Sequence, residues 1–141
     1  MASHSNFTRR AVLAMLAAAG LITPAAALTP MTSRTASVLR SLLDTQHASA
    51  AHLGRAYLAM APAEAETDKL IHALDIGIPD LAAMTERGDQ SVVRSALAGR
   101  ITRDFGEGLT TVLDGWVISR TEARLCALHA LDGPPNAVLS S

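Results

Sequence analysis

Beyond residue 27 the chain carries four histidines and a single cysteine, the side chains best suited to hold a metal or transfer a proton. His47 and His52 stand five residues apart, which does not bring two ligands onto one helix face as a four-residue step would. Cys126 and His129 are three apart and can share a face, but zinc or copper needs two further ligands and none stands nearby. We therefore interpret the thiol as buried and the four histidines, His72 among them, as structural or solvated. A small metal or haem carrier that uses His47, His52, His129 or Cys126 is the alternative.

The patterns that usually accompany catalysis are missing from the sequence. No serine stands in a Gly-x-Ser-x-Gly turn, and no glycine-rich loop of the kind that holds phosphates or dinucleotides occurs. One cysteine cannot supply the C-x-x-C-H attachment of a c-type haem. The formal net charge of −1 offers no basic surface for nucleic acid. We predict a protein that is not an enzyme, holds no cofactor and does not bind nucleic acid.

The clearest local pattern lies in the last third of the chain. Asp114 and Gly115 stand between two short apolar runs, the usual signature of a two-residue β-hairpin turn. Ser119 ends the second run and Glu122 follows three residues later, which is the spacing of a capping box at the start of a helix. A Gly-Pro-Pro run then stops the helical pattern that follows. We predict a hairpin that leads directly into the final helix.

The only tryptophan, Trp116, directly follows this turn, and Arg120 and Arg124 lie one helical turn apart behind it. The structural interpretation has Trp116 fill the core. The functional interpretation places all three side chains at a contact surface, because tryptophan and arginine are enriched among the residues that dominate protein interfaces. Two arginines on one helix face would also suit a partner that carries carboxylates.

The middle of the chain is expected to form helices that position this segment. Apolar residues at three- and four-residue steps predict one long helix over residues 35–60 and a shorter one over residues 63–75. Asp80 is expected to cap a brief helix. Asp89 is expected to cap a longer helix whose apolar side includes Val92, Val93, Leu97, Ile101 and Phe105.

Composition agrees with a helical fold. Hydrophobic residues make up 49% of the chain but aromatic residues only 3%, and much of the remainder is alanine, which favours closely packed helices over a modest core. No internal repeat or low-complexity linker divides residues 28–141. We predict a mainly α fold, a small helical bundle with one short β-hairpin before the last helix, in a single domain of residues 28–141.

Residues 1–27 have the three parts of an export signal. Arg9 and Arg10 give a positively charged start, and an uninterrupted apolar run follows. Ala25 and Ala27 then form an A-x-A-like cleavage site behind a proline. The apolar run is too short to span a membrane. We predict that the mature chain is periplasmic and has no transmembrane segment.

The stretch TRRAVL at residues 8–13 resembles the twin-arginine export motif, in which two arginines precede an apolar pair. This resemblance implies transport of a protein that is already folded, bound to a cofactor or to a partner; general secretion is the alternative route. In layout the chain also resembles the small subunits, with such signals, of membrane-bound flavin sugar and alcohol dehydrogenases of the gluconate or sorbitol dehydrogenase type.

That resemblance implies a non-catalytic accessory subunit. Such a subunit binds a larger periplasmic oxidoreductase and can lend its export signal to it. A free-standing structural protein of the periplasm is the remaining alternative.

Overall fold

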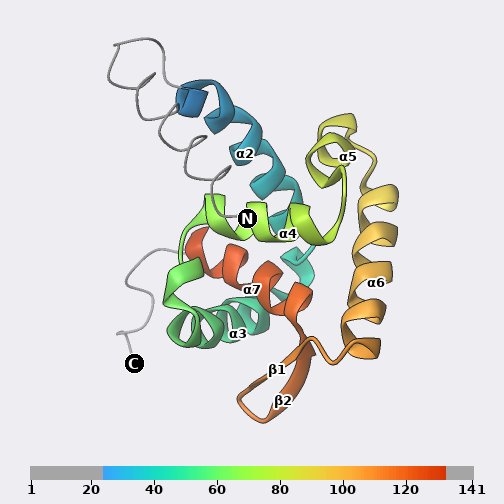
Figure 1. Ribbon diagram of the computed structural model, residues 1–141. Helices are drawn as coiled ribbons and strands as arrows, with labels where there is room; N and C mark the ends of the chain where they lie inside the picture. The colour runs from blue at the N-terminus through green and yellow to red at the C-terminus, as the bar shows by residue number, and fades with distance from the viewer. Residues whose placement is uncertain (1–23, 133–141) are drawn as a thin grey trace, which may run out of the picture. The chain divides into compact units, whose positions relative to one another are not determined.

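The computed structural model describes residues 24–132, with side chains from Thr32 onward. Internal contacts divide the chain into two units between residues 31 and 32, and residues 32–132 belong to the second. The elements in chain order are α2 (Pro24–Ser41), η1 (Asp44–Gln46), α3 (His47–Met60), η2 (Pro62–Glu64), α4 (Thr67–Gly77), α5 (Leu81–Arg87), α6 (Gln90–Gly106), β1 (Thr110–Leu113), β2 (Trp116–Ser119) and α7 (Arg120–Asp132) (Figure 1).

This architecture confirms the predicted fold class, a mainly helical protein with one short hairpin before the last helix. Arg9 and Arg10 of the predicted export signal lie outside the described residues, as does the Gly-Pro-Pro run. Ala25 and Ala27 fall within α2, ahead of the described side chains. None of the helices within residues 24–132 combines the length and apolar character that crossing a membrane requires.

The final helix α7 is the central element of the second unit. It contacts α3, α4, α6 and both strands, and Figure 1 shows it running between its helical neighbours. Leucines and alanines occur on every side of α7, so it has no broad polar face and is buried nearly all round. Its buried residues are Thr121, Ala123, Leu125, Cys126, Ala127, Leu128 and His129.

Helix α3 packs against α7 in the antiparallel sense. His47 at the start of α3 meets His129 near the end of α7, whereas Gly54, farther along α3, lies against Cys126. The backbones approach so closely at Gly54 that an added Cβ would collide with the carbonyl of Cys126 and come within 2.8 Å of the Cβ of Ala130. Glycine is therefore required there by space, in the middle of a helix where it otherwise weakens the backbone.

The prediction of one helix over residues 35–60 is wrong. Helix α2 ends at Ser41, and hydrogen bonds of the tighter i to i+3 kind carry the chain through η1 into α3, such as those from the N–H of Leu43 to the carbonyl of Arg40 and of Gln46 to that of Leu43. A straight helix of that length would span roughly 39 Å. The break lets α2 and α3 bury their apolar faces in the same core, so tertiary packing overrides the local pattern.

Two smaller expectations also change. The shorter helix predicted over residues 63–75 begins later, at Thr67 in α4, because η2 precedes it. Asp80 stands at the start of α5 in a left-handed conformation, with φ 64°, and its side chain makes no capping hydrogen bond. A left-handed Asp80 is not in the extended conformation that a capping side chain normally needs.

Helix α6 begins as predicted but buries fewer of its apolar residues. The carboxylate of Asp89 accepts hydrogen bonds from the backbone N–H of Ser91 and Val92 and so caps the helix. Val93 and Leu97 are buried, whereas Val92 and Phe105 are exposed. The face that α6 buries is therefore narrower than the apolar side predicted from the sequence.

The hairpin and α7 are fixed to α6 through one buried acid. The strands pair in antiparallel register, Leu113 opposite Trp116. Asp104 of α6 is only 2% exposed, and its Oδ2 accepts hydrogen bonds from the backbone N–H and the hydroxyl of Thr121, at 2.9 and 2.6 Å. Arg100 donates to Oδ1 at 2.8 Å. Burial acts to raise the pKa of Asp104, but these hydrogen bonds and the charge of Arg100 outweigh it and hold the pKa below its ordinary value.

The contact at Gly54 generates a direct test of the fold. We expect Gly54→Ala to lower the free energy of unfolding by about 2–3 kcal/mol, since the backbone of α7 must move to admit a methyl group. The matched control is Gly99→Ala in α6, where nothing lies within 4 Å of an added Cβ. This change should raise stability by about 0.5–1 kcal/mol through helix propensity. Urea denaturation measures both, and equal stability of the two variants would contradict the packing described.

Candidate functional site

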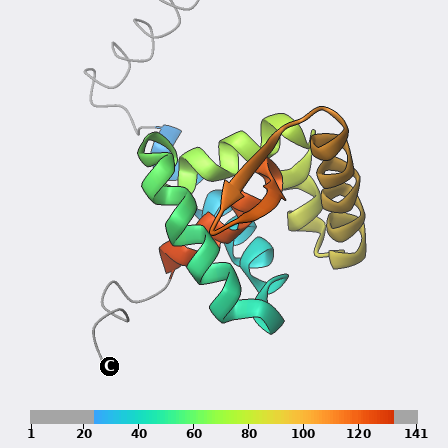
Figure 2. The same ribbon diagram turned by 90° about the horizontal axis from the view of Figure 1, so that it is seen from below.

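A groove lies between α3 and the hairpin, beside Asp114 and Trp116. It has a volume of about 570 Å³, within the usual range for binding sites. Helix α3 contributes Ala48, Ser49, His52 and Leu53 to its lining. The hairpin contributes Asp114, Trp116 and Ile118. Figure 2 shows the tip of the hairpin beside the middle of α3.

Trp116 forms the hairpin wall of this groove and does not fill the core. Its side chain is 72% exposed, which rules out the structural interpretation of the sequence pattern. The core position opposite it in the strand register is occupied by Leu113, which is 1% exposed.

The hairpin also exposes apolar side chains on its other face. Val112 and Val117 are directly opposite each other in the register, and each is 58% exposed. Successive residues of a strand point to opposite faces, so Val117 and its neighbour Trp116 face opposite ways. Val112, Trp116 and Val117, together with the groove, are called the hairpin surface below.

The rim of the groove carries one polar pair. The imidazole Nε2 of His52 lies against the Oδ2 of Asp114, and both side chains are at least half exposed. Asp114 and Gly115 both have positive φ, 51° and 82°, as a type I′ turn requires. Ser49 also lines the groove. To act as a nucleophile, Ser49 would need to donate a hydrogen bond from its hydroxyl to the second ring nitrogen of His52. No such hydrogen bond is found within residues 32–132. An exposed pair of this kind adds little to stability.

Behind the hairpin, Ser119 and Glu122 make the reciprocal hydrogen bonds of a capping box. The N–H of Ser119 donates to Glu122 Oε2, and the N–H of Glu122 donates to Ser119 Oγ, each at 3.0 Å. This cap fixes where α7 begins relative to β2. It therefore also fixes the position of the hairpin surface.

The structure separates the two arginines from Trp116 and gives them different surroundings. Arg124 forms a bidentate ion pair with Glu64 of η2, with its Nε and Nη2 donating to the two carboxylate oxygens at 3.0 and 2.9 Å. Tyr57 of α3 donates its hydroxyl to the same carboxylate at 2.8 Å. Arg120 is exposed. Arg124 thus serves inside the fold, and neither arginine lines the groove.

This network shifts the pKa of each member. The hydrogen bond from Arg124 is the main cause that lowers the pKa of Glu64 below its ordinary value, with Tyr57 and the charge of Arg120 acting in the same direction against burial. Hydrogen bonding to Glu64 likewise raises the pKa of Arg124. Burial, and then Glu64, raise the pKa of Tyr57. All three groups stay in the charge states that hold α3, η2 and α7 together.

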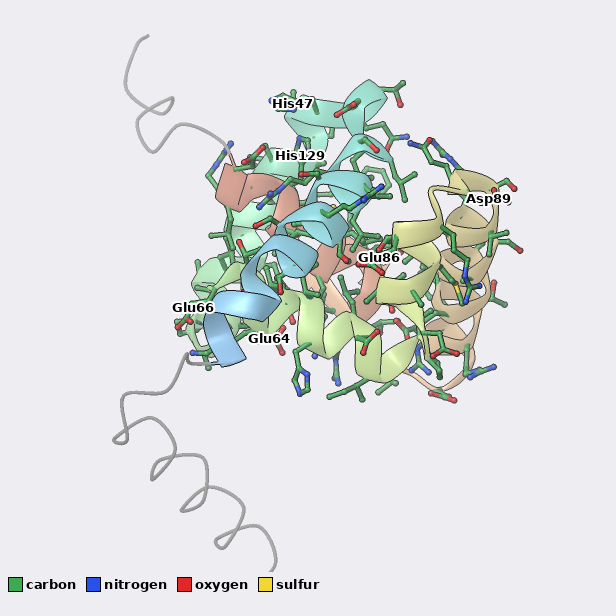
Figure 3. All side chains as sticks on the ribbon, turned by 90° about the horizontal axis from the view of Figure 1, so that it is seen from above. His47, Glu64, Glu66, Glu86, Asp89 and His129 are labelled. Carbon is green, nitrogen blue, oxygen red and sulfur yellow. The ribbon has the colours of Figure 1, made fainter. Side chains whose placement is uncertain are left out.

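His47 and His129, 82 positions apart in the chain, lie side by side (Figure 3). Nε2 of His129 and Nδ1 of His47 are 2.6 Å apart, and the rings meet edge to face. Nδ1 of His129 is buried and has no hydrogen-bond partner. A metal bound to Nε2 of His129 would force the proton onto Nδ1. That would bury an N–H without an acceptor, so the pair is a poor set of metal ligands.

The other cysteine and histidine side chains considered in the sequence lie apart from one another. Cys126 is buried, and burial raises the pKa of its thiol to about 11, so the thiol stays protonated. His72 lies exposed on α4. Within residues 32–132 no three His, Cys, Asp or Glu side chains come together as metal ligands.

No protein-family model, no curated protein and no solved structure matches this chain.

The His52–Asp114 pair and the groove were missed in the sequence. Asp114 was assigned only to the turn, and His52 lies 62 positions earlier. No local spacing links residues so far apart. The alternation of side chains along a strand indicates that Val112 and Val117 share one face of the hairpin. This alternation does not say which of the two faces is buried.

The histidine pair generates a pH prediction. Burial, and then the neighbouring His47, lower the pKa of His129, against the opposing charges of Asp44 and Asp132. Below the ordinary histidine pKa of about 6.5 the unfolded chain binds a proton that the folded chain resists. The free energy of unfolding should therefore fall as the pH drops from 7.5 to 5.5, before the carboxylates protonate.

Denaturation by urea at several pH values measures this slope. His129→Gln should flatten the slope between pH 7.5 and 5.5, whereas the control His72→Gln, at an exposed position, should leave the slope as it is. The same slope in the wild type and in His129→Gln would refute this role of His129.

Proposed function

We propose that this chain is a non-catalytic accessory protein that binds a larger protein through the hairpin surface. The exposure of Trp116 is the observation that carries the proposal. A tryptophan side chain offers 150–250 Å² of surface for burial, at roughly 25 cal/mol per Å². Leaving it in water forgoes that gain unless a partner covers it.

The distribution of apolar groups favours a protein over a small molecule as the partner. A ligand in the groove would cover Trp116 and Ile118 on one face of the hairpin. It would leave Val112 and Val117 on the opposite face in water. A protein that receives the protruding hairpin can cover both faces at once. The capping box and the hydrogen bonds to Asp104 hold the base of the hairpin in place, which limits the entropy lost on binding.

The location and kind of partner rest on the sequence. The twin-arginine-like signal with Arg9 and Arg10 supports export to the periplasm in a folded state, with cleavage near Ala25 and Ala27. The layout shared with small subunits of flavin dehydrogenases supports a large oxidoreductase as the protein bound and co-exported. In this proposal the hairpin surface contacts that oxidoreductase.

The test is capture of the partner from a periplasmic extract of the native host by the tagged full chain. We expect one stoichiometric oxidoreductase, and Trp116→Ala should weaken its binding at least about 30-fold, as loss of an interface hot spot does. Thermal stability should change little, because Trp116 lies at the surface. Met60→Ala is the control, since Met60 is 62% exposed on α3 but does not line the groove.

Two outcomes would reject the proposal. One is a chain recovered alone from the periplasm. The other is a companion whose binding is equally strong with Trp116→Ala and with Met60→Ala. Changing Arg9 and Arg10 together to lysine should remove the chain and its companion from the periplasm, and their continued presence there would reject the twin-arginine route alone.

A further inference from the structure

A second cavity, of about 180 Å³, lies between α4, α6 and the start of α7. It shares no lining residue with the groove. Three arginines line it, Arg100 from α6 and Arg120 and Arg124 from α7. This cavity is called the arginine pocket. Apolar side chains, Leu74 and Leu109 among them, form other parts of its wall.

Two of these guanidinium groups are held in place by ion pairs with acids. Arg124 uses Nε and Nη2 for Glu64, and Arg100 uses Nε and Nη2 for Asp104, with a longer contact to Glu107 at 3.4 Å. A guanidinium group has five N–H donors, so each keeps donors that these acids do not use. The two side chains are 17% and 20% exposed, so they are largely ordered before any ligand arrives.

Arg120 is the guanidinium group that makes no direct ion pair, although its charge acts on Glu64 from a distance. No hydrogen bond or ion pair of its side chain is found within residues 32–132, and its backbone N–H donates to the carbonyl of Leu109. It lies exposed on α7, one turn before Arg124. The arginine pocket thus combines two preorganised guanidinium groups with one that has no partner.

We propose that the arginine pocket binds a single carboxylate group. Arg120 supplies the attracting charge, and the unused N–H groups of Arg100 and Arg124 donate to the carboxylate oxygens. Asp104 also lines the pocket, and its buried negative charge disfavours a doubly charged phosphate more than a singly charged carboxylate. The apolar wall accommodates a short alkyl chain attached to the carboxylate. The group can belong to a free organic acid or to the C-terminus of a polypeptide.

The site is tested by NMR titration of the purified chain, following the arginine side-chain N–H signals. Propionate should shift these signals in a saturable way, while its neutral counterpart propionamide should not. Arg120→Ala should weaken propionate binding about tenfold, the usual scale for a lost charge-assisted contact. Arg120→Lys should retain part of the affinity, because it keeps the charge but not the planar fork. Arg94→Ala, at an exposed position outside the pocket, should bind as the wild type does.

N-acetylleucine separates the two sources of the carboxylate. Tighter binding than propionate would point to a polypeptide C-terminus, and equal or weaker binding would point to a free acid. The proposal fails if propionamide binds as well as propionate, if phosphate binds more tightly, or if Arg120→Ala leaves binding unchanged. Because the pocket shares no residue with the hairpin surface, Trp116→Ala should not affect this titration, so the two proposals stand or fall separately.

Discussion

The close approach of α3 and α7 at Gly54 is the constraint on which the rest of the second unit depends. The carbonyl of Cys126 occupies the space where any larger side chain would place its Cβ. Because helices can approach so closely only over a small residue, this one contact sets the distance between α3 and the central helix. His52 and Leu53 of α3 form one wall of the groove. Because α7 contacts both α3 and the hairpin, it sets the distance between the two walls.

Two acids fix the orientation of α7 within this frame. Asp104 accepts both donors of Thr121 at the first turn of α7, and Glu64 accepts the guanidinium of Arg124 one turn later. The backbone N–H groups at the start of a helix otherwise have no partner. Asp104 of α6 accepts from one of these N–H groups, and Glu64 of η2 pairs with the charge of Arg124, so two separate segments are tied to the central helix. The hairpin, which leads directly into α7, is thereby held at its base while its tip remains in water.

The surface differs from the hydrogen-bonded contacts that hold α7. The hairpin exposes three apolar side chains, Val112, Trp116 and Val117, which give one protruding element two apolar faces. The arginine pocket, on different elements, combines three arginines with an apolar wall, and two of these arginines are already paired with acids. The apolar hairpin and the arginine pocket suit ligands of different chemistry. Helix α7 supports both, because it follows the hairpin directly and supplies two of the three arginines.

The sequence by itself determined the local features. The Asp114-Gly115 turn, the cap between Ser119 and Glu122, the cap at Asp89 and the helical character of the chain follow from preferences that act over three or four residues. Burial of Cys126 also followed, since apolar neighbours surround it in the helical pattern. These features could be predicted because their physical causes lie within one turn of chain.

Only the tertiary structure decided what those elements do together. The break between α2 and α3, the exposure of Trp116, and the capture of Arg124 by Glu64 depend on which surfaces meet. The contacts between His52 and Asp114 and between His47 and His129 join positions 62 and 82 residues apart. No periodicity encodes such pairings, because a repeating pattern identifies an apolar face but not the surface that will cover it.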